Sequence, residues 1–218
     1  MVTVVFELGS KRVFASALEW PGWCRSAGDE DAALQLLDSY SPRYALVAER
    51  AGLVLPEPDF VVVQRLQGSM TTDFGAPDRA ADAEGAAISA TDGERLSALL
   101  QAAWDILGEV ASSAPEALRK GPRGGGRDTS TVVAHVVAAE TAYARKLGVR
   151  PKEPAADAMA AVAHLRAELL RRLRGERPPD PPARVSVTPS ELWLPRYAAR
   201  RIAWHVLDHA WEIQDRSS

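Results

Sequence analysis

The chain has 218 residues, of which 26 are basic and 29 acidic, so its formal net charge is -3. Its hydrophobic content of 46% and charged content of 25% are those of a folded protein and exclude a chain that is disordered throughout. The charge balance gives no general attraction for nucleic acid or for an anionic membrane. The single cysteine, Cys24, excludes an intrachain disulfide framework and a zinc site built from cysteines alone. No long apolar run or secretion signal is apparent, so we expect a cytoplasmic protein.

Residues 1–68 have the pattern of a small α+β domain. Clusters of β-branched and apolar residues predict three strands, at Val2–Leu8, Lys11–Leu18 and Phe60–Leu66. Apolar residues three and four positions apart predict a helix that begins after Asp29. Ser41-Pro42 predicts a second helix, with Ser41 as the N-cap and the proline in the first turn.

Residues 69–90 are small, polar and without periodicity, which is typical of a linker between domains. Met70 and Phe74 are unusual in a free tether, so we expect part of this segment to pack.

Residues 91–218 have the helical period throughout and predict four amphipathic helices of about 17 to 25 residues. The start and stop signals that bound these helices are Thr91–Glu94 for the first, Asp128, Thr129 or Ser130 and Gly148 for the second, Pro154 and Gly175 for the third, and Thr188–Glu191 for the fourth. The fourth helix is expected to reach about Asp215, with a kink or a restart at Pro195. The predicted fold class is therefore α+β, with a four-helix bundle after the small domain.

Two of the four histidines, His205 and His209, are four positions apart on the last helix. This spacing places both imidazoles on one face, where they could bind one metal ion. Val206 stands where a metalloprotease motif requires glutamate, so a zinc protease is a poor match. Solvated or core histidines, and a histidine–carboxylate hydrogen-bond network, remain as alternatives.

His135 on the second predicted helix is the candidate third ligand. Three histidines from two helices would leave coordination positions for water or substrate, as in catalytic metal sites. Its helix face carries alanines, among them Ala139, which either allow close helix packing or leave room for a ligand. We interpret His164, on the third helix, as a surface or structural histidine.

The face of the last helix around the histidine pair also carries Arg201, Asp208 and Glu212, which are our candidate catalytic residues. Glu212 or Asp208 would orient a ligand imidazole through its free nitrogen, or relay a proton. Arg201 would bind an anionic group of a cofactor or substrate.

The segments STVVAHVVAAETAYARKLG (130–148) and RRIAWHVLDHAWEIQDR (200–216) resemble the DinB-like, or YfiT-like, superfamily of four-helix bundles. The resemblance covers roughly residues 91–216 and places that family's metal triad on His135, His205 and His209. It implies a divalent metal, zinc or nickel, and an enzyme that uses a low-molecular-weight thiol such as mycothiol or bacillithiol for transfer or isomerisation.

The stretch FASALEWPGWCRSAGDEDAALQLL (14–37) is similar to the HicB family, with a strand, a Pro-Gly turn, a short strand and a helix in that order. No DNA-binding segment is evident beside it. We therefore expect residues 1–68 to be an accessory domain or a partner-contact surface.

Other features of the sequence have simpler interpretations. Gly121–Gly126 is read as a flexible connection and Cys24 as a cysteine without a nucleophilic role. The arginines between Arg166 and Arg177 are read as a solvated basic helix end, and Trp193, Trp204 and Trp211 as core residues, with Trp193 as a candidate for a pocket mouth.

Our leading hypothesis is a divalent-metal-dependent, thiol-dependent transferase or isomerase that acts on a small electrophilic molecule. The second is a non-catalytic interaction protein in which the metal or a histidine–carboxylate network only stabilises the bundle, and the third is a metal-free protein with structural histidines. We expect a small-molecule substrate, and we expect neither nucleic acid nor a membrane as a partner. A homodimer is a further possibility that the sequence does not decide.

Overall fold

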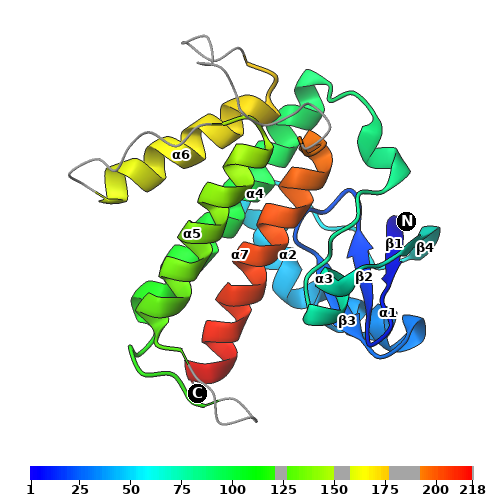
Figure 1. Cartoon of the computed structure of the whole chain (residues 1–218), viewed down its shortest axis with the longest axis horizontal. Coiled ribbons are helices and arrows are strands. Elements are labelled where there is room, and N and C mark those ends of the chain that lie inside the picture. The colour runs from blue at the N-terminus through cyan, green and yellow to red at the C-terminus, as the bar shows by residue number, and fades with distance from the viewer. Residues whose placement is uncertain (121–126, 150–157, 177–191, 218) are drawn as a thin grey trace.

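The structure is a computed structural model that describes residues 1–120, 127–149, 158–176 and 192–217. It has an α+β fold in which an N-terminal sheet lies beside long helices (Figure 1). The sheet has the strand order β3-β2-β1-β4 and contains β1 (Val2–Leu8), β2 (Val13–Ala17), β3 (Cys24–Ala27) and β4 (Phe60–Gln67). β2 is antiparallel to β1 and β3, whereas β4 is parallel to β1. The three strands predicted from the residue pattern are confirmed, and β3 is the additional short strand after the Pro-Gly turn.

The turn between β2 and β3 brings the sheet against the last helix. Gly22 has a φ of 95°, a left-handed conformation that favours glycine. A Cβ atom at this position would lie 2.6 Å from the Leu207 side chain, so a larger residue would push the turn away from that helix. Gly22 therefore contributes to the close approach of the two halves of the chain.

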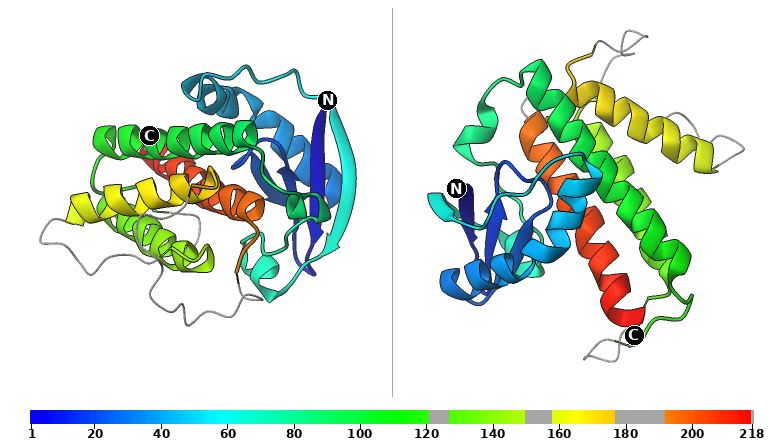
Figure 2. Two further views of the ribbon diagram at one scale, coloured as in Figure 1. Left: turned by 90° about the horizontal axis from the view of Figure 1, so that it is seen from above. Right: turned by 180° about the vertical axis from the view of Figure 1, so that it is seen from behind.

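Two helices, α1 (Glu30–Ser39) and α2 (Ser41–Arg50), follow the sheet hairpin (Figure 2). α1 begins after Asp29, as the sequence predicts, and Asp29 caps it by accepting a hydrogen bond from the Ala32 backbone N–H at 2.8 Å. The prediction that Ser41 caps α2 is wrong, because Tyr40 holds the N-cap position and makes no side-chain cap. Pro42 does lie in the first turn, where its missing N–H costs no helical hydrogen bond.

Residues 69–90 contain a short helix, α3 (Met70–Phe74), and a 3-10 turn, η1 (Asp82–Gly85). The expectation that part of this segment packs is confirmed, since Thr72, Ala81 and Glu84 are buried. Met70 and Phe74, the residues that prompted it, are 75% and 85% exposed. Polar groups hold the segment instead. The buried carboxylate of Glu7 accepts hydrogen bonds from the backbone N–H groups of Asp78 and Arg79 at 2.9 and 3.0 Å. Short polar segments can be anchored in this way because buried carboxylates require such donors.

Four long helices make up the rest of the described chain: α4 (Ala90–Ser113), α5 (Thr129–Lys146), α6 (Ala158–Leu173) and α7 (Pro195–Ser217). α7 packs against all three of the others, most extensively against α4. The buried residues of α6 are Leu165, Leu169 and Leu173, whereas residues 158–160 at its start are exposed.

The start of α4 differs from its prediction. The structure caps it with Ser89, whose hydroxyl accepts from the Asp92 N–H at 3.1 Å, so the capping box precedes the predicted Thr91–Glu94 box by two residues. α5 and α6 are followed by Gly148 and Gly175 in the left-handed conformation, as predicted.

The described part of the last helix begins at Pro195, and Leu192–Leu194 are not helical, so this proline starts a helix and does not kink one. The predicted signals at Gly121–Gly126, Pro154 and Thr188–Glu191 lie outside the described residues.

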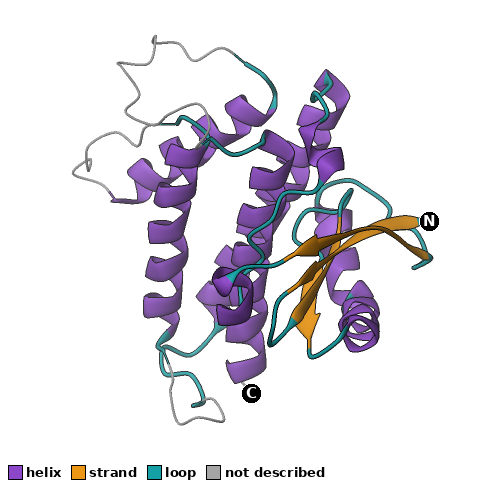
Figure 3. Cartoon of the chain, turned by 45° about the vertical axis from the view of Figure 1, so that its right-hand side comes forward, coloured by secondary structure: helices purple, strands orange, loops and turns teal. Residues whose placement is uncertain are grey.

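A connected hydrophobic core runs through both parts of the chain, from the sheet to α7. In Figure 3 the sheet packs directly beside the helices. The division into domains at residues 69–90 stays a prediction. Within the described residues, the helices lack the length and apolarity that crossing a bilayer would require.

Candidate metal centre

The side chains of His135, His205 and His209 meet between α5 and α7. One ring nitrogen from each lies within 4.8 Å of the other two, which is close enough for a shared metal ion. The Nε2 atoms of His135 and His205 are 3.3 Å apart. The prediction that these three imidazoles converge on one point is therefore confirmed.

These distances can be compared with those in a tetrahedral zinc site. Zinc–nitrogen bonds of about 2.0–2.1 Å at the tetrahedral angle place two ligand nitrogens about 3.4 Å apart. The separation of the His135 and His205 nitrogens agrees with this value. The His209 ring is nearly perpendicular to both others, with ring centres 5.0 and 4.7 Å away. The donor set thus fits a divalent ion with at most a small movement of His209.

Glu212 determines which nitrogen His209 can offer to an ion. Its carboxylate lies 2.7 Å from His209 Nδ1, one turn along α7, and this contact leaves Nε2 as the nitrogen that His209 can offer to an ion. The hydrogen bond with His209 is the largest reason why the pKa of Glu212 is lowered. Arg216 holds the second carboxylate oxygen at 2.9 Å. A carboxylate behind a histidine in this way is typical of metal-ligating histidines.

The environment favours neutral imidazoles at His205 and His135. Burial, followed by the positive charges of His209 and Arg201, lowers the pKa of His205 to about 2. Burial and the charge of His209 also lower the pKa of His135. Neutral imidazole has a free lone pair and is the form that binds metal ions.

One side of the cluster is open to solvent. His135 is exposed and His209 is partly exposed, whereas His205 is buried at 7% exposure. A ligand can therefore reach the cluster at His135, whereas His205 is enclosed. An open side of this kind is required of a metal site that also binds water or substrate.

Arg201 extends the polar stripe by one turn beyond His205, as predicted. Its guanidinium lies over the rings of Tyr143, at 5.1 Å, and Trp204, at 4.6 Å. The Tyr143 ring is in turn 5.7 Å from that of His205. Tyr143 is absent from our sequence predictions, although its position eight residues after His135 places it on the same face of α5.

The side chains of Asp208 and His164 pair with residues outside the histidine group. The carboxylate of Asp208 forms an ion pair with Arg25 from β3, and its predicted role at the histidines stays a prediction. His164 on α6 is 3.9 Å from Glu168 and is outside the histidine group. This placement agrees with its interpretation as a surface or structural histidine.

Cys24 is buried beneath α7 and accepts a hydrogen bond from the Ser16 hydroxyl at 3.0 Å. Burial raises the pKa of its thiol to about 11, so the reactive thiolate is scarce at neutral pH. Trp204 and Trp211 are buried, as predicted for core residues. Trp193 is partly buried, and its ring centre lies 5.1 Å from that of Tyr143.

The predicted basic end of α6 is largely paired with acidic groups. Arg166 lies 3.1 Å from the buried carboxylate of Glu140, and Arg174 lies 3.2 Å from Glu94. Arg177 is outside the described residues. These pairs reduce the positive field that an anionic macromolecule would meet on this helix.

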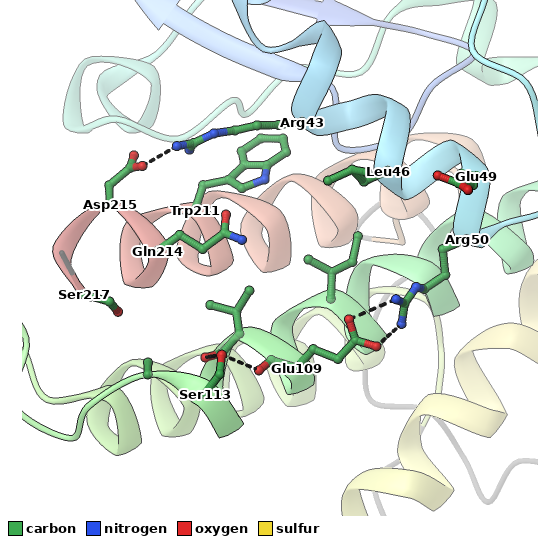
Figure 4. A pocket seen from close by; sticks show the side chains of 13 residues that line it. Arg43, Leu46, Glu49, Arg50, Glu109, Ser113, Trp211, Gln214, Asp215 and Ser217 are labelled. Atoms are coloured by element: carbon green, nitrogen blue, oxygen red, sulfur yellow. Dashed lines mark hydrogen bonds and ion pairs between the residues drawn. The ribbon is translucent and has the colours of Figure 1, made fainter.

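A separate groove of about 970 Å³ lies between α2, α4 and α7 (Figure 4). Trp211, Leu46 and other apolar side chains line it, and the ion pairs Arg43–Asp215 and Arg50–Glu109 lie at its edges. Its lining contains no histidine, so we do not connect it with the metal centre.

Comparison of this chain with models of known families, with curated proteins and with solved structures gives no match in any of the three. The candidate site therefore depends on its own geometry and on the sequence resemblance.

Proposed function

We propose that the protein is a divalent-metal-dependent enzyme acting on a small molecule, with His135, His205 and His209 as the metal ligands. The observation that carries this proposal is the 3.3 Å separation of the His135 and His205 Nε2 atoms, with a His209 nitrogen within 4.8 Å of both. Zinc and nickel are the proposed ions, since imidazole ligands suit both.

The surrounding residues give each ligand a defined role. A bound divalent ion would lower the pKa of a coordinated water or thiol, making a nucleophile available at neutral pH. Glu212 positions His209 by holding its Nδ1–H. The exposed side of His135 leaves a path for the small molecule, and the buried His205 fixes the inner wall of the site.

We propose a low-molecular-weight thiol such as mycothiol as the co-substrate, and transfer or isomerisation as the reaction class. In a transfer, the thiol sulfur forms a bond to an electrophilic carbon of the substrate as the leaving group departs. The support is the resemblance of residues 130–148 and 200–216 to DinB-like proteins, together with the four long helices α4, α5, α6 and α7, of which α7 contacts the other three. On the same basis we interpret residues 1–68 as a HicB-like accessory unit.

Metal binding tests the proposal directly. Untagged protein, freed of metal by a chelator, is titrated with Zn²⁺, Ni²⁺ and Co²⁺ beside His205→Ala and His164→Ala variants. We expect one high-affinity site in the wild type and in His164→Ala, and its loss in His205→Ala. Equal binding in all three proteins would refute the proposal.

The visible spectrum of the cobalt-loaded protein separates an enzyme from an interaction protein. We expect a sulfur-to-cobalt charge-transfer band when mycothiol is added, because an open position can accept the thiolate. A spectrum unchanged by thiol or by azide would indicate a closed, stabilising site and would favour the interaction protein. Turnover is then measured with mycothiol and a series of electrophiles.

A further inference from the structure

Next to the three histidines, the buried guanidinium of Arg201 has one nitrogen without a partner. Arg201 is 7% exposed, and its Nη1 atom makes no hydrogen bond with any described residue. His205 Nδ1, on the next turn of α7, is in the same condition. A buried, charged donor without an acceptor is costly, so native proteins rarely keep one unless a ligand or water satisfies it.

The walls around Arg201 are aromatic. The guanidinium carbon lies over the rings of Tyr143 from α5 and Trp204 from α7, 5.1 and 4.6 Å from the ring centres. Tyr143 also contacts Trp193, which extends the aromatic wall beyond Arg201. Tyr143 also makes a side-chain hydrogen bond with Arg201, so that the rings and this bond hold the guanidinium in place while its Nη1 stays without a partner.

The face of α5 that carries His135 and Tyr143 has a small residue between them. His135, Ala139 and Tyr143 follow one another at four-residue spacing and therefore share one face of α5. Ala139, partly buried between the two larger residues, contributes only a methyl group. A larger side chain at this position would occupy the space between Tyr143 and His135.

The charges near the histidines also favour an anion. Arg201 and Arg127 both act as positive charges on His205, and Glu212, already engaged by His209 and Arg216, is the acidic side chain at the cluster. A cationic, partly desolvated surface attracts anionic ligands, and a divalent ion would increase this attraction.

We propose that Arg201 binds the carboxylate of a small planar or aromatic acid beside the histidine centre, with Tyr143 and Trp193 against its apolar part. The inference deepens the proposed function, on which it rests, by naming the substrate class as a small carboxylate. A guanidinium favours this choice because its parallel N–H groups match the two oxygens of a carboxylate.

Benzoate is a suitable probe, and benzamide is its neutral counterpart of the same shape. Metal-free and zinc-loaded proteins are titrated with each compound, and binding is followed by tryptophan fluorescence and by ligand-observed NMR. We expect saturable benzoate binding, benzamide binding at least about tenfold weaker, and a loss of about tenfold or more in Arg201→Gln, as for a hydrogen bond to a charged group. Arg145→Gln, which changes an exposed arginine of α5, is the matched control and should bind like the wild type.

Ala139→Leu provides a second variant if Arg201→Gln does not fold. It keeps the guanidinium but fills the space beside it, so we expect it to lose benzoate binding and to retain zinc. Benzoate binding that is equal in wild type, Arg201→Gln and Ala139→Leu, or no benzoate binding at all, would overturn the inference.

The two proposals can fail separately. Zinc binding without Arg201-dependent benzoate binding would leave the metal centre and refute the carboxylate site. Arg201-dependent benzoate binding to a protein that binds no metal would leave the carboxylate site and refute the metal centre.

Discussion

Replacing Glu212 with glutamine tests whether this carboxylate supports a metal ligand. The substitution keeps the size of the side chain but removes its charge, so the acceptor for His209 Nδ1–H, now 2.7 Å away, becomes a neutral amide oxygen. Since the pKa of Glu212 is lowered by this hydrogen bond, the wild-type residue is a carboxylate throughout the neutral range.

The expected magnitude follows from the position of Glu212 behind a ligand. Loss of such a partner weakens metal affinity by about 10- to 100-fold, or about 1.4–2.7 kcal/mol. Arg216 touches the same carboxylate from the solvent side, 2.9 Å away. Replacing Arg216 with glutamine should cost less than about 1 kcal/mol of metal affinity, because this partly exposed ion pair does not include a histidine.

Competition with a chromophoric chelator measures these affinities for zinc. The matched control is Glu109→Gln, which removes an exposed carboxylate of α4 that pairs with Arg50 away from the histidines. An affinity for Glu212→Gln within twofold of the wild type, while His205→Ala loses zinc, would refute the assigned role of Glu212.

Three further predictions concern stability and reactivity. Glu84→Gln should lower the free energy of unfolding by about 3–5 kcal/mol in denaturant titrations. The buried Arg200 guanidinium lies 2.7 Å from the Glu84 carboxylate and would lose its counter-charge. An effect below about 1 kcal/mol would contradict this. Cys24 should resist thiol reagents at pH 8 until the protein unfolds, since its pKa is raised to about 11, and rapid labelling of the native protein would contradict its burial. The pKa of His205 in the folded protein, about 2, lies below its value of about 6.5 in the unfolded chain. The unfolded chain therefore binds more protons below about pH 6.5. In this range the metal-free protein should lose up to about 1.4 kcal/mol of its free energy of unfolding for each pH unit by which the pH falls. His205→Ala should lack this part of the pH dependence in denaturant titrations made with a chelator present.

The local sequence signals predict most of the fold. The clusters at Val2–Leu8 and Phe60–Leu66 mark strands because β-branched residues pack well on a sheet, and Asp29 marks a helix start because its side chain replaces a missing backbone acceptor. Cys24–Ala27 is harder to identify from its residues alone, since so short a strand owes its structure to pairing with β2.

The sequence identifies the three histidines of the candidate site more readily than the contacts of the residues around them. The spacing of His205 and His209 places them on one helix face whatever the tertiary structure. His135, on the second predicted helix, is the candidate third ligand, and the resemblance places a ligand at the same residue. The pairing of Asp208 with Arg25 depends on how β3 meets α7, which helical spacing does not contain. Tyr143 likewise becomes significant only once α5 faces Arg201.

X-ray absorption at the zinc edge of metal-loaded protein tests the central claim most directly. We predict a first shell of three imidazole nitrogens at about 2.0–2.1 Å with one exchangeable oxygen ligand that gives way to sulfur when mycothiol is added. Zinc that dialyses away from the wild type, or a shell without imidazole scattering, would contradict the account.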